Sequence, residues 1–170
     1  LNQAIEQLQC HLIFDNQCEI QQIKNFLSHL QLKNKKPDGS VCYCTDEDIK
    51  VCGGYDKVSI SKEDLENALK DNFGQGKPYL IVGVASGMGS LRAASNANVK
   101  KELADLFDGF CDLFFGNEDN REYYLKQDRY ENKKNIVLPK PVVSTSDCHS
   151  FTDIENFLGK KYLNKEGILE

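Results

Sequence analysis

The residues with the clearest chemical potential lie near the end of the chain, at Asp147 and His149. They follow Val142, Val143 and a run of small hydroxyl residues, a pattern that predicts a strand and then a turn. Residues two apart on an extended segment point to the same side, so this carboxylate and imidazole could converge on one ion. Zn, Mn or Fe would suit that pair of donors. The alternative is an Asp that caps the following helix and a His on the surface.

The composition limits the classes of function. The chain has 170 residues, of which 40% are hydrophobic and 28% charged, so it can form one domain with a sizeable core. Its net charge of −5 disfavours broad nucleic-acid binding through the electrostatic field alone. No apolar run approaches the roughly 20 residues that a membrane-spanning helix needs. We therefore expect a cytoplasmic protein without a membrane partner.

Seven cysteines at irregular spacing predict reduced thiols in a cytosolic protein. Cys42, Cys44 and Cys52 could contribute to a zinc site, but a second cysteine pair or a pair of histidines is absent from the pattern. Buried or unreactive thiols are the favoured interpretation.

Hydrophobic periodicity predicts helices and strands that alternate along the chain. The expected strands are 12–14, 78–84, 110–115 and the residues before Ser144, and the expected helices are 20–32, 61–73, 99–107, 118–127 and 150–158. No hairpin is predicted, although Asp38 and Gly39 form a turn signal within the polar connection 33–40. This alternation predicts an α/β fold with a mainly parallel sheet or barrel.

Two charged stretches are predicted to be solvated. Asp105, Asp108 and Asp112 are expected on a helix edge and in the loop after it, and the charged stretch 128–135 is expected to be exposed.

A glycine pattern follows the predicted strand 78–84. Gly83, Gly87 and Gly89 are spaced as in short-chain dehydrogenases, where backbone amides hold a pyrophosphate. In that family the motif belongs on the first strand, whereas here it lies mid-chain. We therefore favour a loop at the carboxyl end of this strand, with Arg92 able to meet an anion. A dinucleotide-binding oxidoreductase is the less favoured alternative.

The sequence Ser-Asp-Cys-His-Ser at 146–150 resembles the closing Ser-Asp-Ala-His-Ser motif of PHP (polymerase and histidinol phosphatase) domains. These are metal-dependent phosphoesterases built on a distorted seven-stranded β/α barrel. The stretch 144–160 is similar to the end of the PHP-like region that precedes the AAA-like ATPase in TrlF-type proteins, and similarity continues through 10–14, 23–30 and 112–115. The resemblance implies that 1–160 is part of a (β/α)7 PHP barrel lacking its N-terminal part, and that 161–170 is a polar tail or the start of a linker.

The resemblance also implies a ligand set. Asp147 and His149 match the family's last metal-ligand pair, and His11 matches the mid-domain histidine that follows the family's glutamate. The opening His-x-His motif, the next His or Asp, and the glutamate are absent and would lie upstream of Leu1, so we expect a truncated piece of a longer protein. Two or three divalent ions (Zn, Mn or Fe) are implied for the complete domain, with Arg92 as a phosphate partner.

The implied function is hydrolysis of a phosphoester, in a phosphorylated small molecule or at a nucleic-acid end. The domain would belong to a polypeptide that also carries an ATPase region. Because the first ligand set is absent, we expect this chain to be inactive by itself, and we assign no further catalytic residue. A PHP-like scaffold or sensor without catalysis is the main alternative.

Overall fold

The computed structural model describes residues 9–85, 105–130 and 137–143. In chain order the elements are β1 (Cys10–Phe14), α1 (Ile20–His29), β2 (Gln31–Lys35), β3 (Val41–Tyr43), α2 (Asp46–Val51), η1 (Tyr55–Lys57), α3 (Lys62–Phe73), η2 (Gly74–Gly76), β4 (Tyr79–Val84), β5 (Leu113–Phe115), α5 (Glu118–Leu125) and β6 (Val142–Val143). Residues 105–110 are also helical. These elements form a mixed α/β fold, as the alternation predicts.

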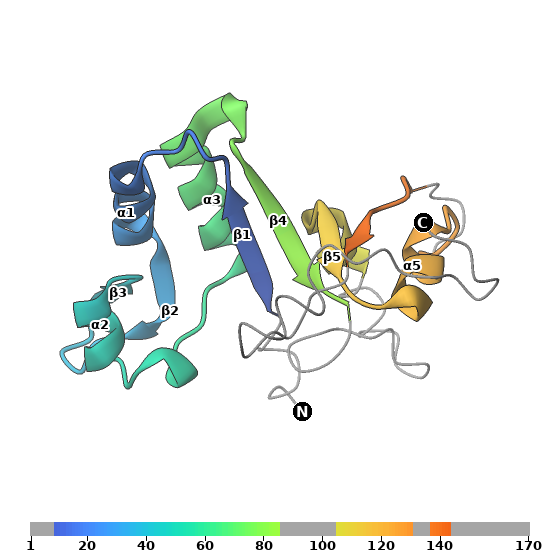
Figure 1. The fold of residues 1–170 in the computed structure, drawn as a ribbon. Helices are drawn as coiled ribbons and strands as arrows, with labels where there is room; N and C mark the ends of the chain where they lie inside the picture. The colour runs from blue at the N-terminus through green and yellow to red at the C-terminus, as the bar shows by residue number, and fades with distance from the viewer. Residues whose placement is uncertain (1–8, 86–104, 131–136, 144–170) are drawn as a thin grey trace, which may run out of the picture.

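The main sheet has four strands in the order β1-β4-β5-β6. The pairs β4–β5 and β5–β6 are parallel, and β1 runs antiparallel to β4 along its whole length. Figure 1 shows β1 beside β4, with β5 and β6 continuing toward α5. The sheet is therefore mostly parallel, and the described part of the chain does not show a closed seven-stranded barrel.

The ladder divides the strand residues between two faces, because successive side chains alternate and paired residues share a face. We call the first the core face; it carries Cys10, Leu12, Phe14, Tyr79, Ile81, Gly83, Phe114 and Val142. The second face carries His11, Ile13, Leu80, Val82, Val84, Leu113, Phe115 and Val143. The apolar side chains that α1, α3 and α5 bury all belong to the cluster on the core face.

The helix α3 forms for reasons visible in its sequence. The Ser61 hydroxyl accepts a hydrogen bond from the Asp64 backbone N–H at 2.9 Å, and Gly74 ends the helix with a φ of 60°. Leu65, Leu69 and Phe73 recur on one side of the helix and are buried against the core face. These features confirm the predicted helix and its cap.

The prediction that the chain lacks hairpins is wrong. β2 and β3 pair antiparallel, and the Lys36 N–H donates to the Ser40 carbonyl across a turn in which Gly39 has a φ of 83°. Since β2 reads Gln-Leu-Lys-Asn-Lys, only Leu32 among its residues is fully buried and marks it as a strand. The expected helix 20–32 therefore ends at His29, and the polar connection contains a strand and a turn.

The short helix α2 is held at its start by polar contacts. The Thr45 hydroxyl accepts from the Asp48 backbone N–H, and the Asp48 carboxylate accepts from the Tyr43 backbone N–H at 2.8 Å. The same carboxylate forms an ion pair with Lys36 at 2.6 Å. Ile49 then packs with Leu32 in a small second cluster.

Among the described residues, no helix is long and apolar enough to cross a membrane.

Gly83 provides a test of packing on the core face. A Cβ at this position would lie 2.6 Å from Phe114 Cε1 and 2.8 Å from Cys111 Sγ, both in buried residues. We expect Gly83→Ala to lower the free energy of unfolding by about 1–3 kcal/mol, because neither neighbour can move without repacking. Gly76→Ala is the matched control, since its Cβ meets nothing within 4 Å. Equal stability of the two variants in urea unfolding would contradict this account.

The contribution of the Asp48 carboxylate to the stability of α2 can be tested by varying the pH. Hydrogen bonds from Lys36 and from the Tyr43 N–H lower the pKa of Asp48 below its ordinary value. Its contribution to stability is therefore complete above the ordinary value of about 3.9 and is lost as the pH falls through the lowered folded value. We expect amide exchange in α2 to accelerate in that acid range, after correction for the intrinsic rate. In Asp48→Asn this acid step should be missing, and its persistence would refute the assignment.

Candidate functional site

The topology gathers several chain segments at one end of the sheet. The parallel strands β4, β5 and β6 finish there at Val84, Phe115 and Val143. Because β1 is antiparallel, its start lies at the same end, with Cys10 paired to Gly83 and His11 paired to Val82. Loops at the carboxyl ends of parallel strands are where α/β proteins place their functional groups. This end of the sheet is therefore the candidate functional site.

His11 is the predicted site residue that the structure describes. It lies on the second face and is exposed. Its ring meets the ring of Phe115 edge to face, with centroids 5.2 Å apart and an interplanar angle of 63°. The contact places His11 over the last residue of β5, where its imidazole can serve as a metal ligand or a base.

Asp147, His149 and Arg92 lie outside the described residues. The structure therefore does not show whether they meet His11. Within the described segments, no group of three or more His, Cys, Asp or Glu side chains is placed to hold a metal ion.

The glycine pattern receives a structural explanation at its first position. Gly83 is on the core face, where Phe114 and Cys111 leave no room for a side chain. Gly87 and Gly89 lie outside the described residues. The described part of the pattern is thus accounted for by close packing of the strand.

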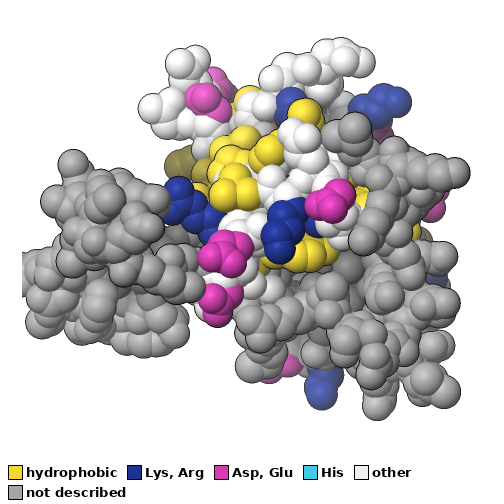
Figure 2. All heavy atoms as spheres, turned by 90° about the vertical axis from the view of Figure 1, so that its right-hand side faces the viewer, with side chains coloured by type: hydrophobic (Ala, Val, Ile, Leu, Met, Phe, Trp, Pro, Cys, Tyr) yellow, Lys and Arg dark blue, Asp and Glu magenta, His cyan; other side chains and the backbone are white. Residues whose placement is uncertain are grey.

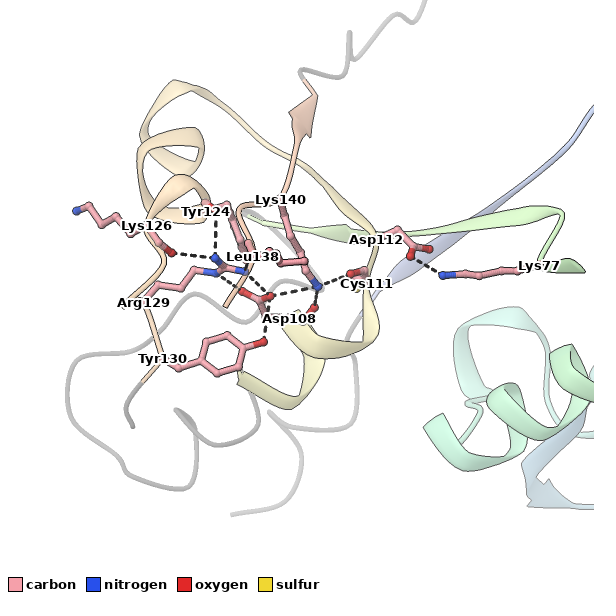
Figure 3. Close-up of polar contacts among 10 residues, drawn as sticks. All are labelled: Lys77, Asp108, Cys111, Asp112, Tyr124, Lys126, Arg129, Tyr130, Leu138 and Lys140. Carbon is pink, nitrogen blue, oxygen red and sulfur yellow. Dashed lines mark hydrogen bonds and ion pairs between the residues drawn. The ribbon is translucent and has the colours of Figure 1, made fainter. Parts of the chain in front are cut away.

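A buried ion pair joins the helical stretch before β5 to the residues that follow α5 (Figure 3). Asp108, from the helical stretch 105–110, is 4% exposed and lies against Arg129, which follows α5. Arg129 Nε donates to Asp108 Oδ2 at 2.7 Å, and Nη2 donates to Oδ1 at 2.9 Å. This two-point geometry matches the planar guanidinium to the carboxylate.

The remaining Arg129 donors reach backbone carbonyls. Nη1 donates to the carbonyls of Tyr124 and Lys126, and Nη2 donates to that of Leu138. Each of the five guanidinium N–H groups therefore has an acceptor, which is the condition for burying such a charge. Burial by itself lowers the pKa of Arg129, but the hydrogen bonds and charge of Asp108 outweigh it and raise the pKa overall.

Two further groups complete the network. The Tyr130 hydroxyl donates to Asp108 Oδ1 at 3.2 Å, and burial together with the Asp108 charge raises the pKa of this tyrosine, so the hydroxyl keeps its proton. Lys140 Nζ lies 3.3 Å from Asp108 Oδ1 and donates to the carbonyls of Asp108 and Cys111. The network thereby ties the stretch before β5 to the stretch that leads into β6.

An apolar surface lies beside this network. Figure 2 shows hydrophobic side chains gathered among Lys, Arg, Asp and Glu groups on the α5 side of the molecule. In this part of the chain, Leu125 is 52% and Leu138 is 80% exposed. Leu125 lies between the two residues whose carbonyls accept from Arg129 Nη1, and the Leu138 carbonyl itself accepts from Nη2, so the apolar surface borders the buried charges.

The network corrects the two predictions of solvated charge. Asp108 is buried, and Arg129 of the supposedly exposed stretch 128–135 has a side chain of 0% exposure. Asp112 also has partners, because its carboxylate accepts from Lys77 Nζ and from the Ile81 backbone N–H. A charge pattern does not distinguish a solvated acid from a paired one when the partner lies some 20 residues away. The only local signal was the apolar setting of Asp108, between Phe107 and Phe110.

A shallow pocket of about 480 Å³ lies elsewhere, between the end of α1, the β2–β3 hairpin and α3. His29, Asp64 and Asp71 are among its lining residues. His11 is not among them, so this pocket is separate from the sheet end described above.

Comparison of the chain with protein-family models, curated proteins and solved structures found no match.

The buried ion pair predicts a large loss of stability when one partner is removed. We expect Arg129→Met to lower the free energy of unfolding by about 3–5 kcal/mol, since it leaves the Asp108 carboxylate buried and unpaired. Lys126→Met is the matched control; this exposed cation is three residues away and should change stability by less than about 0.5 kcal/mol. Chemical denaturation measures both variants, and a comparable loss in the two would refute the role of the pair.

Proposed function

We propose that this chain is part of a PHP-type metal-dependent phosphoesterase, with its site at the carboxyl end of the sheet. The observation that carries the proposal is the position of His11 at the sheet end where β6 finishes, because Asp147 and His149 follow β6 directly in the sequence. Asp147 is four residues beyond Val143, so the chain cannot carry it farther than about 14 Å from the end of β6.

The winding of the sheet supports a portion of a β/α barrel. The parallel strands β4, β5 and β6 lie side by side in their sequence order. The helical stretch 105–110 and α5, which connect them, contribute side chains to the cluster on the core face. A β/α barrel has sequential parallel strands with its helices on one side, and the antiparallel β1 is the departure from that pattern. His11 points to the other face, which would be the barrel interior.

The donor types suit the proposed cofactor. His11 and His149 offer imidazoles and Asp147 a carboxylate, a combination that fits Zn, Mn or Fe. Two or three such ions, when bound, would activate a water and balance charge on the phosphoryl oxygens. In this proposal the three side chains hold the ions, and Arg92 pairs with the phosphate through its guanidinium.

The substrate would be a phosphorylated small molecule or a nucleic-acid end, and an ATPase region would be the partner within the same polypeptide. These parts of the proposal are drawn from the PHP resemblance. Because the family's other ligands have no match in this sequence, the 170-residue chain is expected to bind metal weakly and not to hydrolyse phosphoesters by itself.

Metal binding is the direct test. Titration of the chain with Zn²⁺ or Mn²⁺, followed by calorimetry, should give a site whose affinity falls at least about tenfold in His11→Ala, Asp147→Ala and His149→Ala, because each variant removes a ligand. His29→Ala is the matched control, since this exposed histidine lies at the end of α1, away from the sheet end. Unchanged affinity in all three site variants would overturn the proposal.

Metal binding that depends on these residues, without hydrolysis in any longer polypeptide that contains them, would favour the scaffold alternative. Hydrolysis of a model phosphoester that is lost in Asp147→Ala would favour catalysis. Together, the two measurements distinguish a site that only binds metal from one that also catalyses hydrolysis.

A further inference from the structure

The structure joins Cys42 and Cys52 through a disulfide, which differs from the prediction that the cysteines are reduced thiols. Cys42 lies in β3 and Cys52 caps the end of α2. Figure 1 shows these elements next to each other beside β2, away from β5 and β6. The bond therefore ties the end of α2 back to the hairpin, across a sequence separation of 10.

The unit formed by β2, β3 and α2 makes few other contacts that hold α2 in place. The helix has six residues, too few to be stable alone. Its start is fixed by Thr45 and Asp48, but its end runs into Gly53 and Gly54, which both have φ near 100°. Only Leu32, Cys42 and Ile49 are fully buried in the cluster beneath it. The disulfide is thus the strongest restraint on the end of α2 among the described contacts.

The other cysteines argue against a permanent disulfide framework. Among the described residues, Cys10, Cys18, Cys44 and Cys111 are free. Small secreted domains that rely on disulfides are dense in them, whereas disulfides in reducing compartments are mostly transient or redox-sensing, so one disulfide among free thiols fits a reversible pair.

We propose that Cys42 and Cys52 form a reversible dithiol–disulfide pair that controls how firmly α2 and the following turn are held. In the oxidised form the end of α2 is fixed to β3. In the reduced form the polar contacts at Thr45 and Asp48 remain, and residues 49–57 open more often. The device is independent of the phosphoesterase proposal.

The exposure of the two residues indicates the order of the thiol–disulfide exchange steps. Cys52 is half-buried and can be reached, while Cys42 is fully buried. The Cys52 thiolate attacks oxidised glutathione and releases one glutathione thiolate, which takes up the proton that Cys52 has lost. The Cys42 thiolate then attacks the mixed disulfide and releases the second glutathione. Two protein thiols are oxidised and one glutathione disulfide is reduced to two thiols.

The neighbouring thiols compete poorly in this chemistry. Burial, reinforced by the charge of Asp46, raises the pKa of Cys44. Burial also raises the pKa of Cys10, and it raises that of Cys111 to about 12. Since the thiolate is the attacking species, a raised pKa lowers the fraction of each of these three thiols that can attack oxidised glutathione.

The test compares the chain in reduced and oxidised glutathione. After each treatment, free thiols are alkylated and mapped by mass spectrometry, and amide exchange is followed by peptide. In oxidised glutathione we expect two of the seven thiols to be lost, both in one peptide pair that links Cys42 to Cys52. Exchange of residues 49–57 should slow by at least about tenfold, because the cross-link restricts the open state.

Variants make the assignment specific. Cys52→Ser removes the reachable thiol and should abolish both the linked peptide and the difference in exchange. Cys44→Ser, in the same unit, should leave both unchanged. The proposal is overturned if all seven thiols remain alkylatable after oxidation, if other cysteines form the link, or if reduced glutathione fails to open it. Equal exchange of 49–57 in the two states would also overturn it.

Discussion

The buried ion pair between Asp108 and Arg129 is the constraint on which the β5–α5–β6 half of the fold depends. Burying a guanidinium and a carboxylate is unfavourable unless every donor and acceptor has a partner. Arg129 meets that condition only when the stretch before β5, the end of α5 and the stretch before β6 converge on it. The pair thus selects one arrangement of these segments, and the alignment of β6 beside β5 follows from that arrangement.

That alignment bears directly on the candidate site. β6 is only two residues long, so its own ladder holds it weakly. Lys140 supplies the additional hold, because it reaches Asp108 and the carbonyl of Cys111 just before the chain enters β6. The Lys140 contacts therefore help to fix the position of β6, the described strand that precedes Asp147 and His149 in the sequence. In the proposed phosphoesterase, this network would hold the strand that precedes the two metal ligands in the sequence.

The elements of the fold could be predicted from local sequence more completely than their partners could. Ser61 and the spacing of Leu65, Leu69 and Phe73 were enough to place α3, and the apolar run was enough to place β4. The hairpin was missed because β2 has a single buried side chain. The burial of Asp108 was missed because its partner lies 21 residues away, beyond any local pattern.

The sequence by itself placed helices and strands such as α3 and β4, since caps, periodicity and turn residues act over a few positions, but it did not place β2 and β3. It also determined that a carboxylate and an imidazole follow the strand that contains Val142 and Val143. Only the tertiary structure decided that β1 runs antiparallel, that His11 lies at the carboxyl end of the parallel strands, and that Cys42 meets Cys52. These outcomes depend on pairings between distant segments. Their free energy comes from burial and charge satisfaction, and those are defined only once the segments are packed together.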